Sequence, residues 1–537
     1  MHQDIKVLMA QINPTVGAIQ NNAQQIIQII EDHQDSHDLI VFPELCLNGY
    51  PPEDLLFRPE FRQQTRLYLD KIKTHVKHCH VVLGHTRYTK TDCFNSLSIF
   101  YNGQLKLTYD KQHLPNYSVF DEVRYFTPGE QKTCTLSVKE HSFGFLICED
   151  LWQSGPATHL LAQHIDTLIV LNASPFDINK SSRRHQLLQQ YAKQGVNILY
   201  VNQVGGQDEL LFDGGSVAMD YLGKLCARSP VFAEDLLSVS INKKHLTGSL
   251  APLLHSEELL YRALVYGTQE YVRKNQFQGV IIGLSGGIDS ALTLAIAVDA
   301  LGADKVHAVM MPSQYTANIS NHDALEQIHA LKVPYSTLPI EPLVNAVQST
   351  LAPLFKGLTE DVTEENIQAR ARGLLLMALS NKTGKMVLTT SNKSESAVGY
   401  ATLYGDMAGG LSVLKDVLKT QVYALARFRN TQSFVIPERV ITRAPSAELR
   451  ANQTDQDSLP DYDTLDAIIN HYVVHGGSIQ ELLDQGYDAQ TVHRIIALIQ
   501  RNEYKRQQSA PGIRVSALAF GKDWRYPITN GFKYLQI

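Results

Sequence analysis

The stretch Gly279-Val-Ile-Ile-Gly-Leu-Ser-Gly-Gly-Ile-Asp-Ser290 decides the fold of the second half of the chain. Residues 279–283 predict a buried strand, residues 290–301 predict a helix closed by Gly302, and residues 306–311 predict the next strand. This order predicts a βαβ unit in a parallel sheet. The glycine-rich loop then lies at the edge where open parallel sheets bind their ligands.

The loop between this strand and this helix has the composition of a phosphate site. Gly286 and Gly287 let the backbone approach an anion closely, and the start of the helix presents unpaired N–H groups to it. The loop lacks the Walker lysine, so an ordinary NTPase loop is not indicated. Asp289 would repel a phosphate unless it also held a metal ion, which implies Mg²⁺. The alternative is a tight turn followed by a helix cap, without a ligand.

Apolar runs in the first half of the chain end abruptly at polar residues and predict buried strands. They span residues 38–42, 81–83, 143–147, 168–171 and 197–201. Helices are predicted over residues 22–32 and 182–194. Because strands and helices alternate in this way, the first half is expected to form a layered α/β domain.

The 537 residues suffice for two large domains. Between about residues 245 and 256 the chain mixes Gly, Ser and Pro, which is typical of a boundary. We therefore expect a first domain over residues 1–245, a linker over 246–265 and a second domain over 266–537.

The composition excludes several classes of protein. The 48 Lys and Arg against 54 Asp and Glu leave a net charge of -6, so neither nucleic acid nor anionic lipid is an expected partner. All six cysteines lie in the first 226 residues without CxxC spacing, which argues against a disulfide framework and a zinc ribbon and favours the reducing cytoplasm. No run of 18 or more apolar residues occurs, so no membrane-spanning segment is expected.

Three short motifs stand at the ends of predicted strands in the first half: Val41-Phe-Pro-Glu44, Asp110-Lys-Gln-His-Leu-Pro115 and Leu146-Ile-Cys-Glu-Asp-Leu-Trp152. A thiol attacks a carboxamide only as a thiolate or beside a base, so Cys148 needs a proton acceptor, and Glu44 can serve. Glu44 can then protonate the departing ammonia, while Lys111 can stabilise the oxyanion. Taken singly, each residue has a commoner alternative, because a strand-end cysteine is usually buried and inert and a lysine is usually solvated.

Together, Glu44, Lys111 and Cys148 resemble the catalytic centre of the nitrilase superfamily, over about residues 1–245. This resemblance implies an αββα sandwich that cleaves an amide, and Glu122 matches a second glutamate often found there. The residues that it implies for holding glutamine are Tyr117, Ser174 and Lys180. Because Ser181-Ser-Arg-Arg184 follows directly, the cation that binds the glutamine carboxylate stays open.

The second half carries a further resemblance, from about residue 260 to the C-terminus. Ser285-Gly-Gly-Ile-Asp-Ser290 is similar to the pyrophosphate loop of the N-type ATP pyrophosphatases, which split ATP into AMP and PPi. Residues 365–372, 388–395 and 399–406 resemble the deamido-NAD and ATP segments of NAD synthetase. This resemblance implies a Rossmann-like parallel-sheet domain that binds ATP, deamido-NAD and Mg²⁺.

The resemblance to NAD synthetase also implies contacts for each ligand. Those for ATP are Gly283, Leu284, Ser285, Gly286, Gly287, Ile288, Asp289, Ser290, Thr390 and Lys419. Those for deamido-NAD are Asn366, Arg370, Glu395 and Lys505, and those for Mg²⁺ are Asp289 and Glu395.

The helix that follows Glu365 has two predicted faces. Asn366 and Arg370 stand one turn apart on a polar face, which without the neighbouring motifs would be expected to be solvated. The face predicted to pack in the core carries Ile367, Ala371, Leu374, Leu375 and Ala378.

A nitrilase-like domain fused to NAD synthetase implies a glutaminase that supplies ammonia. The ammonia would amidate deamido-NAD through an adenylate, with release of AMP, PPi and glutamate. A homo-oligomer is also expected. Because free ammonia would be protonated or lost in water, a protein-enclosed passage for ammonia between the two sites is expected as well.

Three alternatives remain at this level. One is a pyrophosphatase-type amidotransferase with a different carboxylate or nucleotide acceptor, and another is a nucleotide sensor without catalysis. The third is a metal site at His75-Val-Lys-His-Cys-His80, but no second ligand group has recognisable spacing, so the end of a surface helix is the favoured interpretation.

Overall fold

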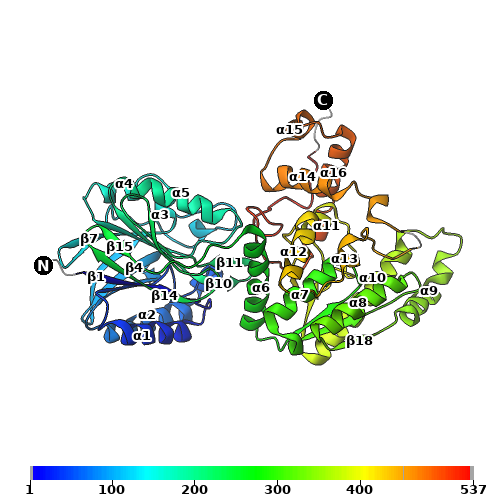
Figure 1. Cartoon of the computed structure of the whole chain (residues 1–537), viewed down its shortest axis with the longest axis horizontal. Helices are drawn as coiled ribbons and strands as arrows, with labels where there is room; N and C mark the ends of the chain where they lie inside the picture. The colour runs from blue at the N-terminus through cyan, green and yellow to red at the C-terminus, as the bar shows by residue number, and fades with distance from the viewer. Residues whose placement is uncertain (1–3, 451–452, 533–537) are drawn as a thin grey trace. The chain divides into compact units, whose positions relative to one another are not determined.

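The structure of the protein is a computed structural model that describes residues 4–450 and 453–532. The chain divides into two units, Met1–Leu254 and His255–Ile537, coloured blue to green and green to red in Figure 1. The predicted linker, residues 246–265, contains the end of strand β15 (His245–Thr247) and the first turns of helix α6 (Ser256–Lys274). Residues 248–255 lie between these two elements. The exact domain limits given by the sequence analysis stay a prediction.

Two mixed sheets form the first unit. The seven-stranded sheet has the order β15-β14-β1-β2-β3-β4-β5 and the six-stranded sheet the order β13-β12-β9-β8-β7-β6. The first comprises β1 (Ile5–Gln11), β2 (Leu39–Val41), β3 (His80–Tyr88), β4 (Cys93–Tyr101), β5 (Gln104–Asp110), β14 (Asp235–Asn242) and β15. The second comprises β6 (Thr135–Val138), β7 (His141–Ile147), β8 (Thr167–Asn172), β9 (Asn197–Asn202), β12 (Val217–Met219) and β13 (Leu225–Arg228).

Helices cover the outer faces of these sheets (Figure 1). Near the seven-stranded sheet lie α1 (Ile19–His33) and α2 (Pro59–His75). Near the six-stranded sheet lie α3 (Glu149–Trp152), α4 (Pro156–Leu161) and α5 (Lys180–Ala192). The remaining elements are the hairpin β10 (Val204–Gln207) and β11 (Leu210–Asp213), and the short helices η1 (Glu53–Phe57) and η2 (Glu122–Arg124). All five strands and both helices predicted in this half are confirmed.

Strand β1 shows how the layers are held together. Val7 and Met9 join the core that lies between the two sheets, whereas Leu8 packs with Ile26 and Ile30 of α1 on the other face. Successive residues of a strand point to opposite faces, so one apolar strand serves both cores. The predicted αββα sandwich is confirmed.

The second unit is built on a parallel sheet of five strands in the order β18-β17-β16-β19-β20. The strands are β16 (Val280–Gly283), β17 (Val306–Met310), β18 (Tyr335–Thr337), β19 (Met386–Thr389) and β20 (Leu411–Ser412). The chain leaves β16 through α7 (Ile288–Leu301) to β17 on one side, and β19 lies on the other side of β16. The carboxyl end of β16 is therefore a switch point of the sheet, where such folds bind ligands.

The helices of the second unit follow the strands. Around the sheet lie η3 (Ala303–Lys305), α8 (Asn318–Leu331), α9 (Glu341–Phe355), α10 (Val362–Thr383), α11 (Lys393–Val398), α12 (Lys419–Gln432) and α13 (Glu438–Thr442). Later in the chain come η4 (Asp455–Asp457), α14 (Tyr462–Ile469), η5 (Asn470–Val474), α15 (Ile479–Asp484), α16 (Ala489–Arg501) and α17 (Glu503–Arg506). The predicted βαβ unit and the Rossmann-like class of this unit are confirmed. Among the described residues, no helix combines the length and apolar character that crossing a membrane requires.

The buried face of α10 differs from the prediction. Leu374 is 62% exposed and Ala378 is also exposed, whereas Ala369 and Leu376 are buried. The cause is Gly373, because a Cβ at this position would lie 2.8 Å from the carbonyl oxygen of Tyr404. The helix packs against backbone through this glycine, so its buried face includes position 373 together with Ile367 and Ala371, which were predicted to be buried.

Candidate active sites

The ends of three strands bring the predicted amide-cleaving residues together in the first unit. Glu44 follows β2, Lys111 follows β5 and Cys148 follows β7, and all three are buried. The end of β8 joins two of them, because Cys148 N donates to Leu171 O at 2.9 Å and Ala173 N donates to Glu44 Oε2 at 2.9 Å. The structure thus gathers the triad at the carboxyl ends of strands from both sheets.

A buried cation links two carboxylates at this site. Lys111 Nζ donates to Glu44 Oε1 at 2.7 Å and to Glu122 Oε1 at 2.8 Å. Asn95 Nδ2 also donates to Glu44 Oε1, at 2.7 Å, and the Tyr50 hydroxyl donates to Glu122 Oε1, at 2.7 Å. The Glu44 carboxylate therefore accepts hydrogen bonds at both oxygens, which holds it in one orientation.

Burial shapes the protonation of this cluster. It raises the pKa of Glu122 to about 7, against the opposing effect of the Lys111 charge. The pKa of Cys148 is raised well above its usual range, first by burial and then by the Glu44 charge, while Lys111 lowers it. The resting thiol is therefore protonated at neutral pH, and its attack on a carbonyl requires a neighbouring base.

Cys148 sits on a sharp turn. The residue lies directly between the end of β7 and the first residue of α3. Its φ of 42° and ψ of -96° lie outside the regions that non-glycine residues usually occupy. Strained turns of this kind persist when the surrounding structure enforces them, and they concentrate at active sites.

The three residues predicted to hold glutamine have different surroundings. The Tyr117 hydroxyl donates to Glu149 Oε2 at 3.0 Å, and Ser174 is buried after β8 with its N–H donating to Asn202 Oδ1 at 3.0 Å. Lys180 Nζ lies 4.4 Å from the centre of the Trp152 ring, and burial lowers the pKa of this lysine.

The neighbouring arginines are already engaged. Arg183 forms an ion pair with Asp177, and Arg184 pairs with Asp213 at 3.0 Å in a buried position. No carboxylate of the described residues forms an ion pair with Lys180 Nζ. Of the three cations, Lys180 is therefore the one left to meet an incoming carboxylate.

Glu149 was not singled out from the sequence. It is buried next to Cys148 and accepts hydrogen bonds from Tyr117 and from Gln153 Nε2, the latter at 2.9 Å. Its place directly after the cysteine was the available signal, but only the fold shows that its carboxylate faces Tyr117.

In the second unit, the glycine loop depends on one backbone conformation. Gly286 has a φ of +80°, and a Cβ there would lie 2.3 Å from the carbonyl oxygen of Ser320. Ser285 Oγ and Ser290 Oγ lie 3.1 Å apart, and Gly287 N donates to Ser285 Oγ at 3.2 Å. The loop is thus preformed against α8.

A cavity of about 250 Å³ opens beside this loop. Its lining includes the loop residues Gly283, Leu284 and Ser285, and Thr390 at the end of β19. This volume, between the ends of adjacent parallel strands, is where a nucleotide is expected. Sequence reasoning missed two further lining groups, Arg372 of α10 and Glu448.

The two predicted metal ligands lie on either side of a lysine. Lys419 Nζ contacts Asp289 Oδ2 at 2.5 Å and Glu395 Oε1 at 3.0 Å, and Asn392 Nδ2 donates to Asp289 Oδ1 at 2.8 Å. Burial raises the pKa of Glu395 to about 8, while the Lys419 charge opposes this rise. The two carboxylates are hard oxygen donors close to one cation, which is the donor chemistry that Mg²⁺ prefers.

The residues predicted to bind deamido-NAD converge on one segment, residues 399–403. Asn366 Oδ1 accepts from Thr402 Oγ1 at 2.8 Å, and Arg370 Nε donates to Leu403 O at 3.2 Å. Lys505 Nζ donates to the carbonyl oxygens of Gly399 and Ala401, both at 2.8 Å. Glu395 belongs to α11, directly before this segment. Residues far apart in the sequence are thus gathered around one loop.

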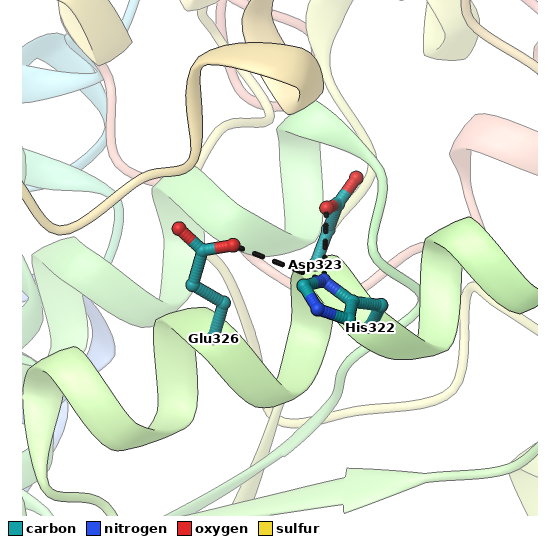
Figure 2. A group of neighbouring side chains, drawn as sticks. All are labelled: His322, Asp323 and Glu326. Atoms are coloured by element: carbon teal, nitrogen blue, oxygen red, sulfur yellow. Dashed lines mark ion pairs between the residues drawn. The ribbon is translucent and has the colours of Figure 1, made fainter.

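Two other clusters of potential metal ligands have structural roles. His75 ends α2 and bonds to Glu31, while His80 stacks on Tyr101, so these imidazoles do not share a ligand. Figure 2 shows His322, Asp323 and Glu326 on α8, with His322 Nδ1 3.7 Å from Asp323 and 3.8 Å from Glu326. The buried Asp323 carboxylate already pairs with Arg439, which leaves this surface cluster without a free central ligand.

Comparisons with known proteins agree with this arrangement. Residues 6–248 match the carbon-nitrogen hydrolase family and residues 260–509 match the NAD synthase family. A glutamine-dependent NAD(+) synthetase of Acinetobacter baylyi is 48% identical over 99% of both chains, and one of Xylella fastidiosa (strain 9a5c) is 47% identical over 99% of this chain and all of that one. A solved structure of the Acinetobacter baumannii glutamine-dependent NAD+ synthetase with ADP is 45% identical, covers 99% of both chains and has a TM-score of 0.81.

The fold and the two sites define a class of carbon-nitrogen ligase in which a nitrilase-type glutaminase is joined to a nucleotide-binding synthase unit. Within that class, the chain belongs to the glutamine-dependent NAD(+) synthetases. The activity expected from the sequence, glutamine-dependent synthesis of NAD(+), is confirmed.

Proposed function

We propose that Cys148, Glu44 and Lys111 release ammonia from glutamine. Glu44 takes the thiol proton as Cys148 Sγ attacks the amide carbon, and it returns that proton to the departing ammonia. Lys111, which touches Glu44, stabilises the negative oxygen of the tetrahedral intermediate. Water then hydrolyses the thioester to glutamate. The observation that carries this proposal is the convergence of the three residues around the end of β8.

Glutamine is held, in this proposal, by Tyr117, Ser174 and Lys180. Lys180 pairs with the α-carboxylate, since Arg183 and Arg184 are engaged elsewhere. A matched pair of variants tests this choice. Lys180→Gln is expected to raise KM for glutamine at least tenfold, whereas Arg183→Gln is expected to leave it within threefold. The reverse ranking would assign the carboxylate to Arg183.

The second unit is proposed to bind ATP at residues 283–290, Thr390 and Lys419, and deamido-NAD at Asn366, Arg370, Glu395 and Lys505. Asp289 and Glu395 would hold Mg²⁺, which when bound neutralises charge on the ATP phosphates. Their fit to the ion rests on two carboxylates that face one cation, since both lie within 3.0 Å of Lys419 Nζ. The unit would adenylate deamido-NAD with release of PPi, and ammonia would then displace AMP.

Variants at the carboxylate pair test the second site. Asp289→Ala is expected to abolish PPi release. Glutamate release is expected to be largely kept, because the residues proposed to cleave glutamine lie in the other unit. Mn²⁺ binding followed by its electron paramagnetic resonance signal in the presence of ATP gives a readout besides activity. Unchanged Mn²⁺ binding in Asp289→Ala would exclude this metal site.

We further propose a homo-oligomeric enzyme of the cytoplasm. The α9 helix carries no buried residue, and its Leu354 side chain is 75% exposed, so that a second copy would bury apolar surface. All six cysteines are free thiols, which suits a reducing compartment. Sedimentation equilibrium tests the oligomer, and a monomer at micromolar concentration would refute it.

A further inference from the structure

We propose that Asp150 is a positioning residue that sets Lys111 in its place relative to Cys148. This inference rests on the proposed roles of Lys111 and Cys148 in glutamine cleavage. Asp150 belongs to α3, two residues after the nucleophile, and its side chain is fully buried. It is not among the residues that touch glutamine or the reacting atoms in the proposed mechanism.

The Asp150 carboxylate binds the chain on both sides of Lys111. Its Oδ1 accepts the backbone N–H of Gln112 at 3.1 Å and that of His113 at 2.8 Å. Its Oδ2 accepts the hydroxyl of Tyr109 at 2.9 Å. One side chain therefore restrains residues 109, 112 and 113, while the backbone of Lys111 itself bonds to Asn95 and Gly129.

The other end of this link is the turn that carries Cys148. Leu151 N donates to Cys148 O at 3.1 Å, so a backbone hydrogen bond ties the first turn of α3 to the nucleophile. The path from Cys148 through Asp150 to the residues on both sides of Lys111 is thus short, and its hydrogen bonds are buried at Tyr109 and partly buried at Gln112 and His113. Since Lys111 must stay within hydrogen-bonding distance of Glu44, a shift of about 1 Å in its strand end is expected to lower the rate about 100-fold.

The charge of Asp150 favours this role. Burial raises its pKa to about 6, while the N–H of His113 and the Lys111 charge act to keep it ionised. A buried carboxylate costs stability unless its oxygens are bonded, and here each oxygen has a donor. A carboxylate that only filled space would be replaceable by an apolar residue.

Asp150→Ala tests the proposal against a matched control. Asp220 also accepts two backbone N–H groups, those of Leu222 and Lys224 at 3.0 and 2.9 Å, but in the turn between β12 and β13, which carries no proposed site residue. Asp150→Ala is expected to lower kcat for glutamate release roughly 100-fold with KM for glutamine within threefold. Asp220→Ala is expected to lower the melting temperature without changing kcat.

Active sites are counted by complete alkylation of Cys148 with a chloroketone analogue of glutamine, so that unfolded protein does not lower the apparent kcat. Asp150→Asn, which keeps an oxygen for both N–H groups, is expected to recover kcat to within about tenfold of the wild type. If Asp150→Ala does not fold, Tyr109→Phe decides, with an expected three- to tenfold loss of kcat at unchanged KM.

Several results would overturn the proposal. They are a kcat of Asp150→Ala within threefold of the wild type, an equal loss in Asp220→Ala, or a folded Asp150→Asn as inactive as Asp150→Ala. In the case that Asp150→Ala does not fold, an unchanged kcat in Tyr109→Phe overturns it. Failure here is distinct from failure of the proposed mechanism, which would appear as retained glutamate release in Cys148→Ala.

Discussion

Replacing Lys111 by methionine should separate the stability of the glutaminase site from its chemistry. The methionine side chain is similar in length to that of lysine, but it lacks the ammonium that bonds to Glu44 and Glu122. Both carboxylates then remain buried without this partner. Removal of one partner from a buried ion pair costs about 3–5 kcal/mol of unfolding free energy. We expect a loss of that size at pH 8.

The loss should depend on pH. Burial already raises the pKa of Glu122 to about 7 in the folded wild type, and loss of the Lys111 charge, which lowers this pKa, is expected to raise it further. The folded variant then binds protons that the unfolded chain, with glutamate pKa values of about 4.3, does not bind. The difference in stability between variant and wild type therefore shrinks as the pH falls from 8 to about 7, by at most about 1.4 kcal/mol per pH unit, and levels off below pH 7, where Glu122 of the folded wild type also takes up a proton.

Urea unfolding gives the measurement. The protein has two tryptophans, Trp152 in the first unit and Trp524 in the second, so a Trp524→Phe background reports the first unit alone. In that background, adding Glu122→Gln to Lys111→Met is expected to restore stability, because one of the two unpaired charges is gone. A loss below about 1 kcal/mol at pH 8, or the same loss at pH 5.5, would refute the buried triad as described.

Two further predictions concern single residues. Lys111→Met should lower kcat for glutamate release by a factor of about 10²–10³ and leave ammonium-dependent NAD(+) synthesis intact, which assays with each nitrogen donor compare. Gly286→Ala should abolish ATP cleavage, because its Cβ would lie 2.3 Å from Ser320 O at a φ of +80°. ATP binding measured by calorimetry checks this. The control is Gly302→Ala, whose Cβ would meet no atom within 4 Å. Equal binding in both glycine variants would contradict the close approach.

The sequence predicted the architecture well because its signals were local. Buried strands appear as apolar runs, and Glu44 and Cys148 follow such runs by three residues and by one residue, whereas Lys111 follows the largely polar strand β5. Likewise, the strand, glycine loop and helix around Gly286 lie within about twenty residues and are recognisable without any tertiary contact.

Features that depend on tertiary contacts were not predictable from these patterns. The buried face of α10 was predicted correctly at Ile367 and Ala371 but wrongly at Leu374 and Ala378, because Gly373 packs on backbone from residue 404, some thirty positions later. The position of Lys419 between Asp289 and Glu395 joins three separate segments, and the bonds from Asp150 to residues 112 and 113 join two strand ends. No spacing in the sequence indicates either arrangement.

The central claim is that cleavage of glutamine at Cys148 supplies the nitrogen that the second unit adds to deamido-NAD. It is tested most directly by AMP formation and by the nitrogen in the product, with amide-¹⁵N glutamine or unlabelled ammonium as donor. The wild type is expected to form ¹⁵N-labelled NAD(+) from glutamine, and Cys148→Ala should form NAD(+) from ammonium only. Labelled product from Cys148→Ala, or loss of synthesis with both donors in the folded variant, would contradict the account.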